Sequence, residues 1–204
     1  MSDFGYFLSC EEHGPAELVD QARMAEQAGF DSLWISDHYR RWNDRQGQSP
    51  FVRTVTGALS QAVSLPVETA VTCPLVRTHP AVIAQAAATG AAQLGGSFRL
   101  GVGTGEQTSH HGKHYTNERL PGELPQILPT PRHFEQASEL VTEDRVAAAV
   151  PCGDDPDAHI EALAAFVDAG FDAGFDVVYV NQIGKDQQGF FDFYRTRILP
   201  RLRD

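Results

Sequence analysis

The sequence predicts an α/β fold with a parallel sheet. Apolar strand-like runs alternate with helical patterns four times between residues 4 and 102. These runs are apolar rather than alternating, which is typical of parallel strands that helices cover. The order helix, glycine, Phe-Asp and apolar strand also occurs twice, at 25–36 and 167–180. That order is typical of a helix that leads back into a sheet.

Each element follows from periodicity and from the residues at its ends. Pro15 suits the first turn of a helix and Gly29 suits its end, with apolar residues at helical spacing between them. The same reasoning places the other helices between apolar β-rich runs. The expected strands are 4–9, 32–36, 67–72, 98–102 and 177–183, and the last of them is expected to be buried. The expected helices are 14–30, 51–63, 79–94, 132–149, 156–169 and 189–202.

Two segments break this regularity. Residues 105–131 hold Gly, Pro, His and Asn without a clear period, so we expect a mostly irregular junction there. The second helix-to-strand order contains "AGFD" twice in tandem, at 169–176. We expect the four extra residues to form a bulge or a longer turn before the strand.

Composition limits the partners. The net charge of −11 disfavours nucleic acid as a general partner, although a small phosphorylated ligand needs only a local group of donors. No run approaches the ~18 apolar residues of a membrane span, so no membrane partner is expected. Three widely spaced cysteines indicate free thiols in a reducing compartment. The start of the chain shows no basic leader. We therefore expect a cytoplasmic protein.

The glycines of "RLGVGTGEQTSHHGKHY" (99–115) do not form a nucleotide motif. They alternate, are followed by Glu106 and lead into no helical pattern, whereas a dinucleotide loop opens directly into a helix. His110 and His114 would share a face only on a helix, and no third ligand has a clear spacing. We expect no metal site here.

Chemistry-bearing residues follow three of the predicted strands. Asp37 and His38 follow the second strand, residues 70–74 follow the third, and Glu106 follows the fourth. Parallel strands bring their carboxyl ends to one edge of the sheet, where such acids and an imidazole could transfer protons. Structural roles remain alternatives: a cap for Asp37, a loop histidine for His38, and a solvated loop end for Glu106.

Three long stretches carry a family resemblance. "SDHYRRWNDRQGQSPF", "TAVTCPLVRTHPAVIAQAAATGAAQLGG" and "FRLGVGTGE" resemble the luciferase-like superfamily. Within it they are most similar to the coenzyme F420-dependent oxidoreductases akin to glucose-6-phosphate dehydrogenase. The resemblance covers 4–106 and resumes from about 118 to the end. It implies one domain over 1–204 with a TIM (β/α)8 barrel, which would be incomplete because about five of its eight strands are present.

The resemblance also implies roles for individual residues. His38 would be the base near the reacting carbon, Trp42 would wall the site and stabilise the transition state, and Glu106 would donate a proton to the deazaflavin ring. In this family the end of the third strand is bulged and often contains a cis peptide, and it supports the ring. The residues that would contact coenzyme F420 are Asp37, His38, Ala70, Val71, Cys73, Gly105 and Glu106.

The implied function is hydride transfer between a small substrate, a sugar phosphate or an alcohol, and the deazaflavin. The family's middle segment is absent at the 105–131 junction, and with it the basic residue for a sugar phosphate. Two alternatives remain: a non-catalytic remnant with a partial barrel, or an FMN-dependent monooxygenase of the same superfamily. An incomplete barrel has two strand edges with unpaired backbone groups. The fourth strand could pair with the last one, or two chains could complete each other as a homodimer.

Overall fold

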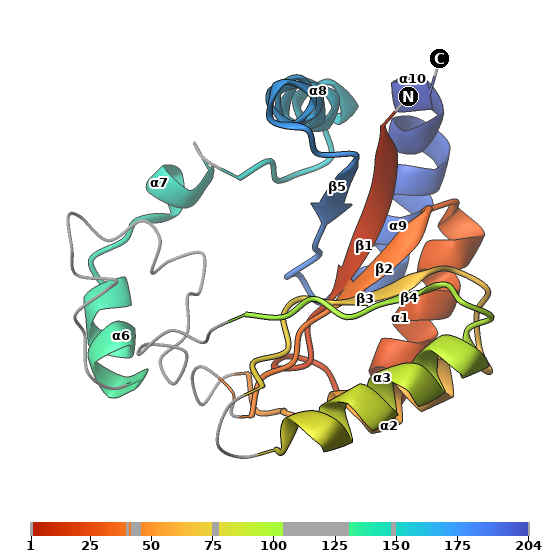
Figure 1. Ribbon diagram of the computed structural model, residues 1–204. Helices are drawn as coiled ribbons and strands as arrows, with labels where there is room; N and C mark the ends of the chain where they lie inside the picture. Colours follow the sequence, from red (N-terminus) through yellow and green to blue (C-terminus); the bar gives the residue numbers. More distant parts are fainter. Residues whose placement is uncertain are drawn as a thin grey trace.

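The computed structural model describes residues 2–39, 41, 46–74, 78–103, 131–147 and 150–203. Its centre is a five-stranded parallel sheet with helices packed against it (Figure 1). The sheet order is β4-β3-β2-β1-β5, so the first and last strands of the chain are neighbours. The strands are β1 (Asp3–Leu8), β2 (Ser32–Ile35), β3 (Val67–Thr69), β4 (Phe98–Arg99) and β5 (Val177–Val180).

The strand register places the carboxyl ends of β1, β2 and β3 side by side. Leu8 pairs with Ile35, and Ile35 pairs with Thr69. β3 and β4 are shorter than predicted because regular pairing stops at Thr69. Beyond that point a single bridge joins Thr72 to Val102. All five predicted strands are therefore present, and the predicted α/β parallel sheet is confirmed.

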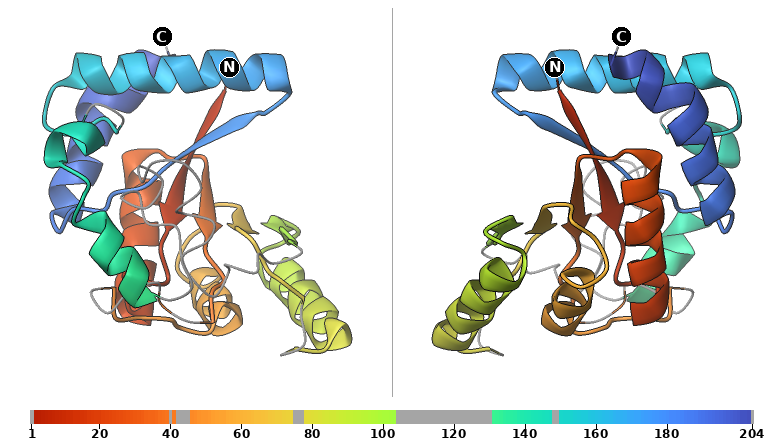
Figure 2. Two further views of the ribbon diagram at one scale, coloured as in Figure 1. Left: turned by 90° about the vertical axis from the view of Figure 1, so that its left-hand side faces the viewer. Right: turned by 90° about the vertical axis from the view of Figure 1, so that its right-hand side faces the viewer.

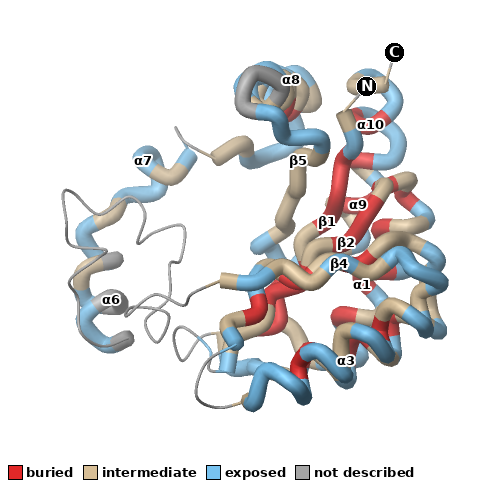
Figure 3. The backbone as a smooth tube through the Cα atoms, viewed as in Figure 1, coloured by how far each residue is buried: buried red, intermediate tan, exposed pale blue. Residues whose placement is uncertain are grey.

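Helices cover one face of the sheet (Figure 2), and the core lies between them and the strands. Figure 3 shows this layer as buried backbone in β1, β2 and α1. Tyr6, Leu8, Leu33 and Ile35 of the sheet are all fully buried, as is Leu18 of α1. The helices that line this face are α1 (Pro15–Ala28), α2 (Val52–Leu59), α3 (Pro80–Gln93), α9 (Gln187–Phe193), the π-helix η1 (Tyr194–Ile198) and α10 (Leu199–Arg203).

Two predicted helices are divided in the structure. The region 132–149 contains α6 (Pro131–Ser138) and α7 (Glu143–Ala147), with a break at 139–142. The closing helix 189–202 is the succession α9, η1 and α10, which begins where the Asp186 side chain accepts a hydrogen bond from the Gly189 backbone N–H at 2.8 Å. A side-chain cap of this kind pairs one of the free N–H groups at a helix start.

The tandem "AGFD" lengthens a helix, not a turn. α8 (Pro156–Ala173) continues through the first copy and ends at Gly174, whose φ of 79° lies in the left-handed region. Four residues are close to one helical turn, so the extra copy extends α8 without rotating its faces. The expectation of a bulge or longer turn was wrong. The prediction of a buried β5 was also wrong, because all four of its residues are only half-buried.

The sheet is open at both sides in the described part of the chain. β4 and β5 are its two outer strands and do not pair with each other, so the first of the two predicted closures is not observed. Residues 105–130 of the predicted junction lie outside the described residues, and residue 131 is the first residue of α6. No helix among the described residues is long and apolar enough to cross a membrane.

The alternating glycines allow close backbone packing beside β3. A Cβ atom on Gly101 would collide with the backbone oxygen of Thr69, and one on Gly103 would lie 2.7 Å from the Val71 side chain. Gly103 N–H also donates to the Thr72 carbonyl oxygen at 3.0 Å. Gly101 and Gly103 are therefore required by packing; Gly105 lies outside the described residues.

We predict that Gly101→Ala destabilises the protein by about 1–3 kcal/mol, because the added methyl group must displace backbone rather than a flexible side chain. Urea unfolding followed by circular dichroism measures this change. Gly57→Ala is the matched control: it lies in α2 with only the Gln93 side chain within 4 Å. This control should gain about 0.5–1 kcal/mol from helix propensity. Equal effects of the two substitutions would contradict the close-packing argument.

Candidate functional site

A buried glutamate lies just beyond the carboxyl end of β1. Glu11 is 2% exposed, and its Oε2 accepts hydrogen bonds from Ser36 Oγ at 2.8 Å and from Ser9 Oγ at 3.1 Å. Ser36 Oγ also accepts from the Cys10 backbone N–H at 2.9 Å. These contacts join the ends of β1 and β2 around one carboxylate.

The His38 imidazole faces this carboxylate. His38 Nε2 lies 3.7 Å from Glu11 Oε1, and the two side chains are 25% and 3% exposed. Within the described residues Glu11 Oε1 is buried and accepts no hydrogen bond. A buried carboxylate beside an imidazole stabilises the ring when it carries a proton. The pair is therefore suited to a histidine base whose ring opens to solvent and whose carboxylate lies behind it.

Asp37 joins the ends of β2 and β3. Its Oδ2 lies 2.7 Å from Arg53 Nη1 and accepts a hydrogen bond from Thr72 Oγ1 at 2.8 Å. Arg53 Nη2 in turn donates to Thr72 Oγ1 at 3.1 Å. The Asp37 carboxylate is thus fully engaged on one oxygen by a cation and a hydroxyl. No helix in the described part of the chain begins at Asp37, so a helix cap, one of its structural alternatives, is not observed.

The segment after β3 departs from regular pairing at a cis peptide between Ala70 and Val71. Such a strand end agrees with the one that the family resemblance implies. Ala70 N–H still donates to the Ile35 carbonyl oxygen at 2.8 Å, so the segment remains attached to β2. Val71 is 39% exposed, and Cys73 is half-buried beside Gly103. The segment therefore presents apolar atoms and backbone at the same edge as His38.

We call the residues that follow β1, β2 and β3 at this edge of the sheet the rim. Five of the predicted site residues belong to it: Asp37, His38, Ala70, Val71 and Cys73. Trp42, Gly105 and Glu106 lie outside the described residues, so their placement remains a prediction. Among the described residues no cluster of three or more His, Cys, Asp or Glu side chains could hold a metal ion.

Two further residues of this site were not predicted: Glu11 of the rim, and Arg53, which contacts the rim from α2. Thr72 was included only as a member of the range 70–74, with no role of its own. Glu11 could have been found, because "SCEEHG" follows the first strand just as "SDHYRR" follows the second. Arg53 lies within a helix and reaches the rim only through tertiary packing. The neighbouring thiol is not a nucleophile of the site, because burial raises the pKa of Cys10 and Glu11 adds to the effect.

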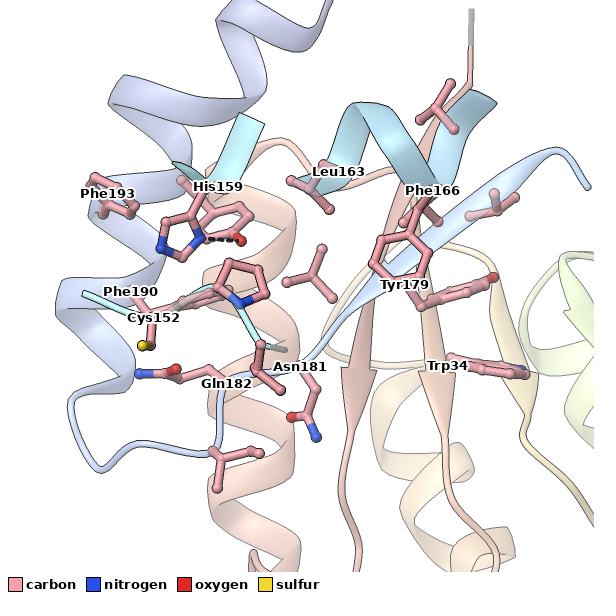
Figure 4. Close-up of a pocket in the computed structure, with 18 of the residues that line it drawn as sticks. Trp34, Cys152, His159, Leu163, Phe166, Tyr179, Asn181, Gln182, Phe190 and Phe193 are labelled. Atoms are coloured by element: carbon pink, nitrogen blue, oxygen red, sulfur yellow. Dashed lines mark hydrogen bonds between the residues drawn. The ribbon is translucent and has the colours of Figure 1, made fainter. Parts of the chain in front are cut away.

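A large cavity extends from the other face of the sheet past the outer strand β5 to α8 and α9 (Figure 4). Its volume is about 1220 Å³, and it includes none of Glu11, Asp37 or His38. Trp34 and Tyr179 stack in its wall with ring centroids 4.8 Å apart, and Ser32 Oγ donates to the Tyr179 hydroxyl at 3.1 Å. Burial raises the pKa of Tyr179 to about 12. Asn181 and Gln182 bring the cavity to the carboxyl end of β5, the edge at which the rim lies.

A protein-family model matches the part of the chain that contains the rim and most of the sheet. The model of the luciferase-like monooxygenase family matches residues 2–124, more than half of the chain. The chain belongs to the luciferase-like monooxygenase family. The resemblance stated from the sequence is confirmed, since the matched region contains β1 to β4 and every rim residue.

Two curated relatives of this luciferase-like chain have the same name. The F420-dependent glucose-6-phosphate dehydrogenase of Intrasporangium calvum is 44% identical over 109 residues, which are 52% of this chain and 32% of that protein. The protein of that name from Nocardia farcinica is 38% identical over 151 residues, 71% of this chain and 43% of the relative. The matched regions thus span well under half the length of these relatives.

Solved structures share the fold. An F420-dependent secondary alcohol dehydrogenase in complex with an F420-acetone adduct superposes with a TM-score of 0.79 at 17% identity, covering 100% of this chain and 99% of that one. Coenzyme F420-dependent tetrahydromethanopterin reductase from Methanopyrus kandleri gives 0.68 at 13% identity, covering 98% and 99%. The predicted luciferase-like TIM-barrel fold, with five strands in the described part of the chain, is confirmed.

The residue beside Glu11 supplies a pH test of the rim. Burial raises the pKa of Glu12, with Glu11 adding to the effect and the Gln46 side chain opposing it. The folded protein therefore holds this proton more tightly than the unfolded chain. The Glu12 contribution to stability is present below the ordinary glutamate pKa and is lost as pH rises through the raised pKa. We predict that Glu12→Gln is more stable than the parent at pH 7, and that the difference shrinks towards pH 4.

Urea unfolding at both pH values measures the two differences. Glu161→Gln is the control, because Glu161 is an exposed residue of α8. A Glu12→Gln protein that is less stable than the parent at pH 7 would contradict a raised pKa for this carboxyl.

Proposed function

We propose that this chain is a coenzyme F420-dependent oxidoreductase that binds the deazaflavin at the rim. The observation that carries the proposal is that the His38–Glu11 pair and the Ala70–Val71 segment, with its exposed Val71, lie at the same carboxyl edge of a parallel sheet. Ligands of α/β folds bind at this edge. The curated relatives matched over the same residues are F420-dependent enzymes by name, which supports the choice of cofactor.

The rim suits a planar ring with a polar edge. Val71 offers partly exposed apolar atoms for a ring face. Glu11 Oε1 is a buried acceptor with no hydrogen-bond donor among the described residues, so a proton on His38 or a bound molecule could satisfy it. We assign cofactor contact to Asp37, His38, Ala70, Val71 and Cys73, and, beyond the described residues, to Gly105 and Glu106.

Coenzyme F420, when bound, supplies a hydride acceptor. In alcohol oxidation the protein must remove the proton of the substrate hydroxyl. We assign this role to His38, because its side chain is 25% exposed at the rim and can reach a bound substrate. Glu11 stabilises the imidazolium that then forms. Asp37, held by Arg53 and Thr72, fixes the backbone from which His38 projects. We assign Trp42 to the wall of the site and Glu106 to proton donation towards the ring.

The substrate class that we propose is a small alcohol, with a sugar phosphate as a narrower case. A sugar phosphate needs a cation that is free to bind it. Arg53, which contacts the rim from α2, is already paired with Asp37. The rim geometry therefore favours a small alcohol over a sugar phosphate as the substrate.

We further propose one domain over 1–204, a cytoplasmic location, no nucleic-acid partner and a homodimer. The strand edges of β4 and β5 support the homodimer, because a second copy could pair with these backbone groups. Sedimentation equilibrium should give twice the monomer mass of 22.3 kDa. A monomer of high solubility at all concentrations would contradict pairing between copies.

We predict that oxidised F420 loses fluorescence when titrated with the protein, and that it binds with a Kd in the micromolar range or below. Binding orders the ring against the rim, and Ala70→Trp should weaken it because the indole would occupy the ring's place. FMN is titrated in parallel. Absence of F420 binding at high micromolar protein would overturn the proposal, and FMN binding alone would favour the monooxygenase alternative.

We predict that His38→Ala lowers the rate of alcohol-dependent F420 reduction by about 10²–10⁴-fold, the usual contribution of a positioned base. Initial rates at saturating F420 measure this loss. His133→Ala on α6 is the matched control, because His133 is exposed and lies outside the rim. A His38→Ala enzyme with the parent's rate would exclude His38 as the base.

A further inference from the structure

Arg53 connects three parts of the chain at the rim. It lies in the first turn of α2, its Nη1 is 2.7 Å from Asp37 Oδ2, and its Nη2 donates to Thr72 Oγ1 at 3.1 Å. The Thr72 hydroxyl donates to the same Asp37 oxygen at 2.8 Å. The guanidinium, carboxylate and hydroxyl thus form a closed triangle between the end of β2, the segment after β3, and α2.

This triangle is shielded from water. The side chains of Arg53 and Asp37 are 15% and 19% exposed, and Thr72 is 2% exposed. The pair between Arg23 and Asp20 on α1 is by contrast 51% and 67% exposed. Exposed ion pairs contribute little to stability, whereas removing one partner of a shielded pair leaves a charge that solvent cannot stabilise. Asp37 and Thr72 therefore depend on Arg53 for their positions, while Asp20 does not depend on Arg23.

Thr72 connects the triangle to the Ala70–Val71 segment. It follows Val71 directly, its N–H donates to the Gly101 carbonyl oxygen at 2.7 Å, and its own carbonyl accepts from Gly103 N–H at 3.0 Å. Its hydroxyl also lies 3.2 Å from Thr69 Oγ1. Thr72 thus attaches the far end of the Ala70–Val71 segment to the strand that contains Gly101 and Gly103, while the Ala70 N–H attaches its near end to β2.

We infer that Arg53 is a positioning residue, which holds Asp37 and the Ala70–Val71 segment in the arrangement that accepts the deazaflavin ring. Arg53 acts through these two neighbours, by an ion pair with Asp37 and a hydrogen bond from Nη2 to Thr72, while its buried Nη1 makes no hydrogen bond among the described residues. The inference rests on the proposed function for its ligand. Its structural part, that Arg53 orders the segment, is independent of any ligand and is tested separately.

The ligand-free test uses Cys73, which is half-buried at the end of the segment. In a Cys152→Ser background the exposed thiol is removed, and Cys10 is buried, so a thiol reagent such as DTNB reports on Cys73. Arg53→Met should raise the rate of Cys73 modification at least about fivefold, because local opening of the segment exposes the thiol. Arg53→Lys should give a smaller rise, since it keeps the charge but loses the two-point contact.

Arg23→Met is the matched control and should leave the Cys73 rate unchanged. Thr72→Val removes the hydroxyl and should raise the rate without changing any charge. The rise in Arg53→Met/Thr72→Val should be smaller than the product of the two single effects, because both remove the same triangle. If Arg53→Met does not fold, the Cys73 rates in Arg53→Lys and Thr72→Val decide whether Arg53 orders the segment. A Cys73 rate equal to the parent's in every variant that folds would overturn the inference.

The ligand test is the F420 titration. Arg53→Met should raise the Kd for F420 at least about tenfold and Arg53→Lys less, while Arg23→Met leaves it unchanged. Kd values in Arg53→Met and Thr72→Val equal to the parent's would overturn the positioning of the ring site even if Cys73 reacts faster. A parent protein that binds no F420 defeats the proposed function instead, and the Cys73 rates still decide whether Arg53 orders the segment.

Discussion

Parallel pairing of β1, β2 and β3 is the constraint on which the rim depends. The register aligns Leu8 with Ile35 and Ile35 with Thr69, so the residues that follow lie side by side although they are far apart in the chain. Glu11 meets His38, and Asp37 meets Thr72, because of this register. The register in turn depends on the buried layer beneath it, where Leu33 and Ile35 pack towards the helices. A slip of one residue would turn these side chains to the other face of the sheet.

The sheet order also leaves the inner face of the sheet, opposite the covering helices, incompletely covered. In an eight-stranded barrel such a face is filled by side chains of opposite strands. Here β4 and β5 are outer strands of the described sheet, and Trp34 and Tyr179 line a cavity of about 1220 Å³ instead. The half-buried residues of β5 have the same cause, since no described strand lies beside the outer side of this strand. A second copy that pairs with these edges would bury both the strands and the aromatic wall.

The site was partly predictable because of one simple rule. Polar residues directly after a strand of a parallel sheet lie at its carboxyl edge, and this placed Asp37, His38 and the Ala70–Val71 segment correctly. The same rule applied to "SCEEHG" would have found Glu11. Arg53 could not be found in this way, because a helical residue reaches a rim only through the length of its side chain and the packing of its helix. The tandem "AGFD" was misread for a related reason: helix and turn compete for the same four residues, and a left-handed glycine at position 174 decided between them.

The sequence by itself determined the succession of strands and helices, the parallel sheet, the family and the residues that follow each strand. Those are properties of local pattern, since periodicity and glycine or proline positions act within a few residues. Tertiary structure alone decided which acid faces His38, which cation pairs with Asp37, and that β4 and β5 stay apart. These are long-range contacts between segments tens of residues distant, and their geometry depends on the packing of the sheet against its helices rather than on any local preference.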